Sequence, residues 1–164
     1  MDYGFNKLGD MMSILRTIAE LMMKKKGKPR TDDGISSKDN VTVILRDAKT
    51  GEIVKQFTKH NIWTSYGRGE IRDALVDGGF NNVSYMYQNG TSSSEQSTSS
   101  SKPSSYVAQW VATWPASPAI TGITEFDLRL SSGGSAAATI IISSFDKPYG
   151  LELEVTWQTN VTTS

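Results

Sequence analysis

The sequence predicts a mainly β protein, an antiparallel β-sandwich with one short helix, preceded by an N-terminal amphipathic helix. From residue 41 onward, apolar and polar residues alternate in short runs between turn signals, which is typical of antiparallel sheets with one wet face. The first 26 residues instead repeat apolar side chains at helical spacing. The segment between them has no apolar period. We therefore divide the chain into an anchoring helix over residues 1–26, a linker over 27–40 and a β-sandwich domain over 41–164.

The N-terminal segment has the pattern of a short coiled-coil helix. Its apolar side chains follow one another at spacings of 3, 4, 3 and 4, which places them on one helical seam. These candidate assembly residues are Leu8, Met11, Leu15, Ile18 and Met22. Charged residues interrupt the apolar run, so it fits neither a transmembrane span nor a signal peptide. A helix of this kind needs a partner, and we expect it to dock against neighbouring chains.

A basic cluster follows the seam directly. It consists of Lys24, Lys25, Lys26, Lys28 and Arg30. Residues 1–30 hold seven basic and three acidic side chains, whereas the whole chain has 17 of each, so only this arm has a field that would draw an anionic partner. The cluster is either a contact for nucleic acid or lipid phosphate, or a solvated helix end whose cations favour the C-terminal dipole.

Seven strands and one helix account for the pattern of the β-sandwich domain. The expected strands cover residues 41–46, 52–58, 83–87, 106–114, 123–130, 137–143 and 151–161. Gly51 suits the left-handed position of the first hairpin turn. Thr64 or Ser65 can cap a helix that runs to Asp77. The serine- and threonine-rich segment 91–101 has too little apolar surface to hold itself in place, and we expect an exposed, mobile loop there.

Composition argues against an enzyme. The chain of 164 residues contains no cysteine and a single histidine, His60. Thiolate zinc sites, cysteine nucleophiles and histidine-rich metal centres are therefore excluded, and a Ser-His-Asp triad would depend on His60 alone. The turn at residues 67–69 lacks the third glycine of a dinucleotide fingerprint and the Gly-Lys-Ser/Thr of a P-loop. We expect no cofactor, no metal and no catalytic residue.

Two groups of side chains on the expected strands are candidate contacts. Tyr85 and Tyr87 alternate beside the serine-rich segment and are candidates for an exposed aromatic pair. Glu125 and Asp127 also share one strand face, but no further acidic ligand lies near them in sequence. Arg129 on the same face can neutralise them, which favours a solvated, salt-bridged surface over a calcium or glycosidase site.

Several short motifs resemble those of small β-rich virion domains of tailed bacteriophages, which occur in tail-tip, tail-fibre and head-fibre proteins. Residues 60–67 (HNIWTSYG) are similar to the N-hydrophobic-x-T-x-x-G opening that precedes a short helix in these domains. The later matches, in the same order, are residues 122–128 (GITEFDL), 140–142, 147–150 (KPYG) and 155–157 (VTW). Asp127 stands where the family motif has a glycine.

This resemblance implies a non-enzymatic structural protein located in the virion, which forms homo-oligomers and contacts other virion proteins. It brings no catalytic residues with it. Two other functions are compatible with the residues. A receptor- or glycan-binding module would use Tyr85, Tyr87 and the serine-rich segment, and a protein that contacts membrane or genome would use the basic N-terminal helix.

Overall fold

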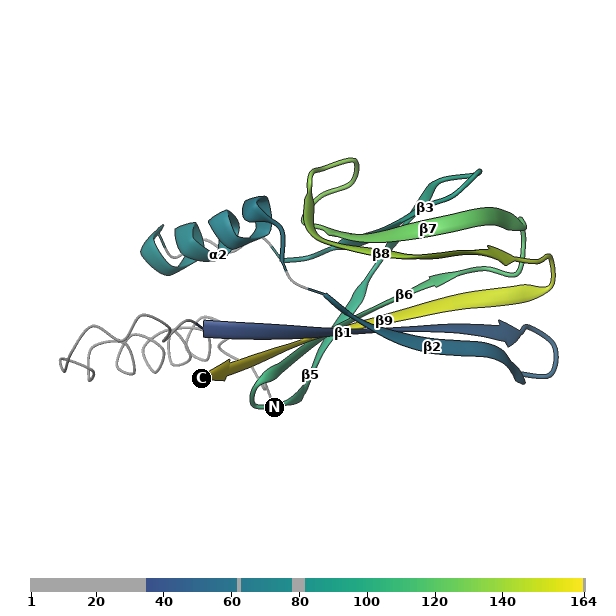
Figure 1. Ribbon diagram of the computed structural model, residues 1–164, viewed down its shortest axis with the longest axis horizontal. Coiled ribbons are helices and arrows are strands. Elements are labelled where there is room, and N and C mark those ends of the chain that lie inside the picture. The colour runs from purple at the N-terminus through teal and green to yellow at the C-terminus, as the bar shows by residue number, and fades with distance from the viewer. Residues whose placement is uncertain (1–34, 62, 78–81, 164) are drawn as a thin grey trace, which may run out of the picture. The chain divides into compact units, whose positions relative to one another are not determined.

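The computed structural model describes residues 35–61, 63–77 and 82–163 (Figure 1). The chain divides into two compact units, residues 1–33 and 34–164, and all described residues belong to the second. The described strands are β1 (Ile35–Asp47), β2 (Ile53–Asn61), β3 (Tyr85–Asn89), β4 (Ser94–Ser97), β5 (Ser99–Ser104), β6 (Val107–Trp114), β7 (Ile120–Arg129), β8 (Ala136–Lys147) and β9 (Leu151–Thr163). The described helix is α2 (Ser65–Asp77).

The strands form two antiparallel sheets. One sheet has five strands in the order β2-β1-β9-β6-β5, and the other has four in the order β4-β3-β7-β8. Neighbouring strands pair antiparallel throughout both sheets. The predicted mainly β class is therefore confirmed, together with a short helix that begins and ends where the sequence predicts. The N-terminal helix predicted over residues 1–26 lies outside the described residues.

The facing sides of the two sheets share one hydrophobic core. Along β9, Leu153, Val155 and Trp157 are buried while the residues between them are half-buried, which is the alternation that the sequence predicts. Trp114 of β6 meets Phe126 of β7 with ring centroids 5.8 Å apart, so aromatic side chains join the two sheets. Burial of one large apolar side chain contributes roughly 1.5–3 kcal/mol.

The first strand begins earlier than the sequence predicts. β1 starts at Ile35, within the segment predicted as a linker, residues 27–40. The backbone of this part pairs with β9, from Ile35 opposite Thr163 to Asn40 opposite Gln158. Main-chain hydrogen bonds to a long neighbouring strand need no apolar alternation, so residues 35–40 are strand rather than linker.

The serine-rich segment 91–101 contains two edge strands where its composition predicts a loop. β4 pairs with β3 in one sheet and β5 pairs with β6 in the other, so the chain crosses between the sheets here. Every side chain of β5 is exposed, which suits serine. The Ser94 hydroxyl accepts hydrogen bonds from Gln88 Nε2 at 3.2 Å and from the Trp114 indole at 3.0 Å. Composition shows how much apolar surface a segment can bury. It therefore does not predict strands that are stabilised by main-chain hydrogen bonds.

Helix α2 begins where Thr64 caps it against β8. The Thr64 hydroxyl accepts a hydrogen bond from the Gly67 N–H at 3.1 Å, as an N-cap residue does. The carbonyls of Ala136 and Ala137 in β8 lie 2.9 and 2.8 Å from the same hydroxyl, and the Thr64 N–H donates to the Ala137 carbonyl at 3.1 Å. Gly67 packs so closely here that a Cβ would overlap the Ala137 carbonyl. The first turn of the helix is thereby seated on the edge of the four-stranded sheet.

Replacing Gly67 with alanine should destabilise the fold, because the new methyl group meets backbone atoms of β8. We expect Gly67→Ala to lower the free energy of unfolding by about 1–3 kcal/mol, the usual cost of overpacking. Gly69→Ala is the matched control in the same helix, since a Cβ there meets nothing within 4 Å. The control should leave the free energy unchanged or raise it by about 0.5–1 kcal/mol. Urea unfolding followed by circular dichroism measures both, and equal stabilities would contradict the contact.

Candidate functional site

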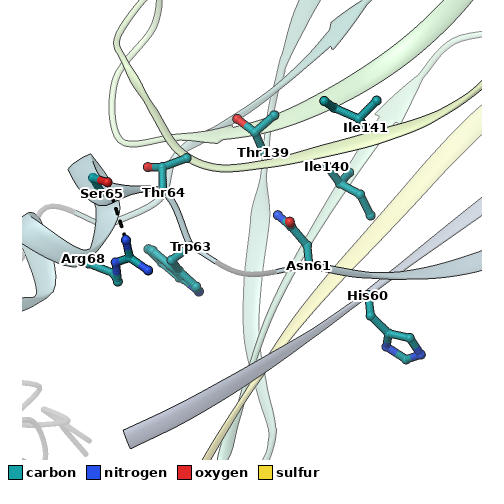
Figure 2. Close-up of a pocket in the computed structure, with 9 residues that line it drawn as sticks. All are labelled: His60, Asn61, Trp63, Thr64, Ser65, Arg68, Thr139, Ile140 and Ile141. Atoms are coloured by element: carbon teal, nitrogen blue, oxygen red, sulfur yellow. Dashed lines mark hydrogen bonds between the residues drawn. The ribbon is translucent and has the colours of Figure 1, made fainter. Parts of the chain in front are cut away.

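A groove of about 510 Å³ opens between the end of β2, the first turn of α2 and the edge of β8 (Figure 2). The residues that line it are His60, Asn61, Trp63, Thr64, Ser65, Arg68, Thr139, Ile140 and Ile141. Figure 2 shows Asn61 pointing toward β8, whereas His60 points away from it. The contacts that start the helix therefore also form one wall of the groove.

The groove has a mixed polar and apolar lining, with the positive charge of Arg68 and no acidic residue. The exposed Arg68 guanidinium lies 3.5 Å from the Ser65 hydroxyl. Asn61 Nδ2 is buried and has no acceptor among the described residues. His60 lies on the opposite side from Ser65 in Figure 2, so these two side chains do not form a base–nucleophile pair. The lining therefore offers polar side chains and one positive charge.

Tyr85 and Tyr87 share the outer side of the four-stranded sheet, as the alternation along β3 predicts. Both are half-buried, whereas Met86 between them is fully buried. The guanidinium of Arg129 lies over the Tyr87 ring, 3.9 Å from its centroid. The aromatic pair is therefore part of a polar cluster, and Arg129 already occupies one face of Tyr87.

Asp127 is the centre of this polar cluster. Its side chain is 7% exposed and accepts hydrogen bonds from Arg129 at 3.0 Å and from the Thr139 hydroxyl at 2.7 Å. The predicted ion pair between Asp127 and Arg129 is confirmed, but Asp127 is buried instead of solvated. Burial raises the pKa of the neighbouring Glu125; the charge of Asp127 raises it further, and Arg129 partly opposes both effects. Each oxygen of Asp127 therefore has one hydrogen-bond partner, Thr139 on Oδ1 and Arg129 on Oδ2.

A buried carboxylate that the sequence does not single out lies at one end of the core. Asp39 of β1 has no exposed surface, and its Oδ2 accepts a hydrogen bond from the Trp157 indole at 2.9 Å. Burial raises the pKa of Asp39, and the Trp157 hydrogen bond opposes that rise. Thr159 and Trp63 lie near the carboxyl and also lower the pKa of Asp39, although neither side chain reaches hydrogen-bond geometry. Asp39 falls in the segment predicted as a linker, and only the pairing of β1 with β9 brings it to this position.

A buried lysine lies near the other end of β9. Lys147 has no exposed surface, and its Nζ donates to the carbonyls of Pro115 at 2.8 Å and Leu151 at 3.1 Å. Burial lowers the pKa of Lys147, and the charge of Glu152 opposes the change. These two bonds tie the turn between β8 and β9 to the end of β6.

Several of the residues that carry the family resemblance act in packing. Thr64 and Gly67 seat α2 on β8. Gly122 has a φ of 64°, and its N–H donates to a carboxylate of β8 at 2.7 Å. Lys147 anchors the β8–β9 turn, and Trp157 holds the buried carboxylate of β1. These residues lie at separate places in the two sheets and stabilise the fold at each of them.

The two remaining sets of predicted site residues lie outside the described residues. They are the assembly seam (Leu8, Met11, Leu15, Ile18 and Met22) and the basic cluster (Lys24, Lys25, Lys26, Lys28 and Arg30). Within residues 35–61, 63–77 and 82–163, no three histidine, aspartate or glutamate side chains gather as they would around a metal ion. No helix in that part of the chain has the length and apolar character of a membrane span.

Asp39→Asn should remove one source of pH-dependent stability. The pKa of Asp39 is raised above its ordinary value of 3.8, so the native state binds this proton more tightly than the unfolded state does. The stability contributed by protonated Asp39 is therefore complete below that ordinary value and is lost as pH rises through the raised pKa. We expect the substitution to increase the free energy of unfolding at neutral pH, with a gain that shrinks as the pH approaches the ordinary value. Guanidinium unfolding of both chains, repeated from neutral pH down to the ordinary value of 3.8, measures this difference in the free energy of unfolding.

Asp47→Asn is the matched control, because the pKa of Asp47 shifts the other way. Backbone hydrogen bonds from Thr50 and then Lys49 lower the pKa of this exposed carboxyl. Its contribution to stability is present above the ordinary value of 3.8 and is lost as pH falls through the lowered pKa. The control should therefore lose stability at neutral pH, and a change of the same sign in both variants would contradict the assignment of Asp39.

Comparison with known proteins adds no relative to these observations. A scan against protein-family models, a search of curated proteins and a search of solved structures each gave no significant match. The residues and contacts described above are therefore the basis for a functional proposal.

Proposed function

We propose that this chain is a non-enzymatic structural protein of a tailed-phage virion, which acts by symmetric assembly and by docking to neighbouring virion proteins. The observation that carries the proposal is the role of the motif residues. Several of those that resemble the virion domains secure the packing of the sheets and of α2, as Gly67 and Lys147 illustrate. Residues of this kind preserve a scaffold, and under this proposal the protein acts through its surfaces.

The anchoring helix predicted over residues 1–26 supplies the assembly contact in this proposal. Its seam of Leu8, Met11, Leu15, Ile18 and Met22 buries apolar area between chains. At about 25 cal/mol per Å² of apolar surface, five such side chains contribute several kcal/mol per helix before entropic costs. The β-sandwich formed by residues 34–164 is then displayed or packed around the symmetry axis.

The partners under this proposal are further copies of the chain and other virion proteins. The basic cluster that follows the seam gives the same arm a second possible role, a contact with phosphate groups of the genome or of lipid. A salt-sensitive association would identify that role, because release of counterions weakens phosphate contacts as salt rises.

Leu15→Asp combined with Ile18→Asp should abolish the higher-order assembly, because two carboxylates then stand in the apolar seam. We expect the wild-type full chain to elute as a large oligomer and the double variant as a much smaller species, measured by size-exclusion chromatography with light scattering. Ser13→Asp combined with Thr17→Asp is the control, since it adds the same charge outside the seam. If the seam variant formed oligomers of wild-type size, the proposed contact would be contradicted.

The virion location is tested on purified particles. The chain should sediment with tailed particles through a density gradient and yield peptides in a constant ratio to the other structural proteins. Its absence from particles of the phage that encodes it would refute the location.

Recognition of a glycan is the second candidate function, and the outer side of the four-stranded sheet favours it. Tyr85 and Tyr87 lie there with charged and hydroxyl side chains, the mixture that binding sites for polar ligands use. Under this function, Tyr87→Ala should lose binding on a glycan array. Tyr149→Ala should keep it, because Tyr149 is 77% exposed at the β8–β9 turn. If the wild-type chain binds no glycan, this second function fails and the assembly function is unaffected.

A further inference from the structure

Several buried polar side chains without a hydrogen-bond partner lie at one place in the described part of the chain. Asp39 of β1 pairs with Asn61 of β2 on one side and with Thr159 of β9 on the other, so these three residues form one row across the five-stranded sheet. Trp63 follows Asn61 closely in the chain and lies near enough to lower the pKa of Asp39. The unpartnered buried atoms, here called the Asp39 cluster, are Asp39 Oδ1, Asn61 Nδ2, Trp63 Nε1 and Thr159 Oγ1. Because buried polar groups are nearly always paired, this cluster requires a physical explanation.

Asp39 is buried without a cation beside it. It has no exposed surface, and its Oδ2 accepts one hydrogen bond, from the Trp157 indole at 2.9 Å. Burial is the largest cause that shifts its pKa; the other causes are the nearby donors of Trp157, Thr159 and Trp63, and none is a positive charge. A buried carboxylate that lacks a cation is costly, and hydration lowers that cost.

No ionisable group on the surrounding elements pairs with Asp39. On β2, Lys59 is exposed, and His60 lies on the other side of the sheet from the neighbouring Asn61. Arg68 of α2 is also exposed. The residues of β9 and β6 beside Asp39 are uncharged, and the part of β8 that lines the groove has no ionisable residue. The protonation of Asp39 therefore responds to pH itself rather than to a neighbouring charge.

The groove of Figure 2 lies directly beside the Asp39 cluster, because Asn61 and Trp63 belong to both. The side chains of these two residues form a partition between Asp39 and the groove. Neither Asn61 Nδ2 nor Trp63 Nε1 has an acceptor that would hold it in place. Water that passes the partition would give hydrogen-bond partners to all four atoms of the cluster.

We propose that loss of the Asp39 proton opens this partition and admits water from the groove to the carboxylate. The neutral acid keeps the partition shut, because it has no charge to hydrate. The ionised acid favours an arrangement in which the side chains of Asn61 and Trp63 separate and water solvates the charge. The fold thus contains a pH-sensitive device, which goes beyond the assembly function proposed above and operates independently of it.

Rising pH is the direction that opens the partition. In the shut arrangement the pKa of Asp39 is raised above its ordinary value of 3.8, whereas a hydrated carboxyl keeps the ordinary value. The shut arrangement is therefore fully favoured below the ordinary value and loses stability as pH rises through the raised pKa. Trp63 bridges Ala138 and directly precedes the Thr64 cap, so the change also reaches the start of α2.

Exchange of indole N–H protons with solvent tests the opening. NMR of the full chain measures the exchange rates of the Trp63 and Trp114 indoles from the ordinary value of 3.8 up to neutral pH. Trp114 is the internal control, since it is also buried but donates to the Ser94 hydroxyl at 3.0 Å. The ratio of the two rates removes the intrinsic pH dependence of exchange, and global unfolding exposes both indoles and leaves the ratio constant. We expect the ratio of Trp63 to Trp114 to rise at least about tenfold as Asp39 ionises, the equivalent of one pKa unit.

Two variants assign the rise to Asp39. Asp39→Asn removes the titrating proton and should keep the ratio constant over the same range. Asp47→Asn is the matched control at the other end of β1, and its ratio should rise as in the wild-type chain. A rise that persists in Asp39→Asn would overturn the proposal.

The wild-type chain alone also decides the question, which keeps the test sharp if a variant does not fold. The rise in the ratio should coincide with the titration of the Asp39 carboxyl carbon resonance. A constant ratio, or a rise that follows the titration of His60 instead, would overturn the proposal. The presence or absence of the chain in virions has no bearing on these outcomes, so the device and the proposed function fail separately.

Discussion

One carbonyl group, that of Ala137 in β8, is the constraint on which the rest of the two-sheet unit depends. A backbone N–H, a hydroxyl and a glycine all converge on it, from Thr64 and Gly67. At this point the chain leaves the five-stranded sheet through β2 and reaches the edge of the four-stranded sheet (Figure 1). Trp63 is buried as a consequence, with its ring 6.3 Å from that of Trp110. The start of α2 and the core at this end both follow from the same contact.

Local patterns predict the parts of the fold that local physics decides. Alternation along β9 predicts which side chains are buried, because burial of apolar surface dominates the choice of face. Gly51 has the left-handed φ of 74° that its hairpin turn requires, and Thr64 caps the helix as its position predicts. Each of these depends on neighbours within a few residues. The sequence therefore predicts the class of the fold and most element boundaries.

The strands that escape prediction have polar side chains that give no apolar alternation. β5 pairs with β6, the next strand in the chain, whereas the start of β1 has a distant partner, with Ile35 opposite Thr163. Distance between paired strands also limits prediction of the candidate site. Alternation predicts that Tyr85 and Tyr87 share a face, but their burial depends on Arg129, which the register of β7 brings beside them. Register between distant strands is a property of the assembled sheet and cannot be deduced from local spacing.

The crossing of the serine-rich chain from one sheet to the other has a consequence for how the surface can vary. β5 is held by its backbone pairing with β6, and all six of its side chains face solvent. Exchange of such side chains typically alters stability by no more than about 0.5 kcal/mol. The residues that specify the fold are therefore different from those of β5, whose exposed side chains can be exchanged without loss of core packing. Substitutions of these side chains would leave the packing beneath the edge unchanged.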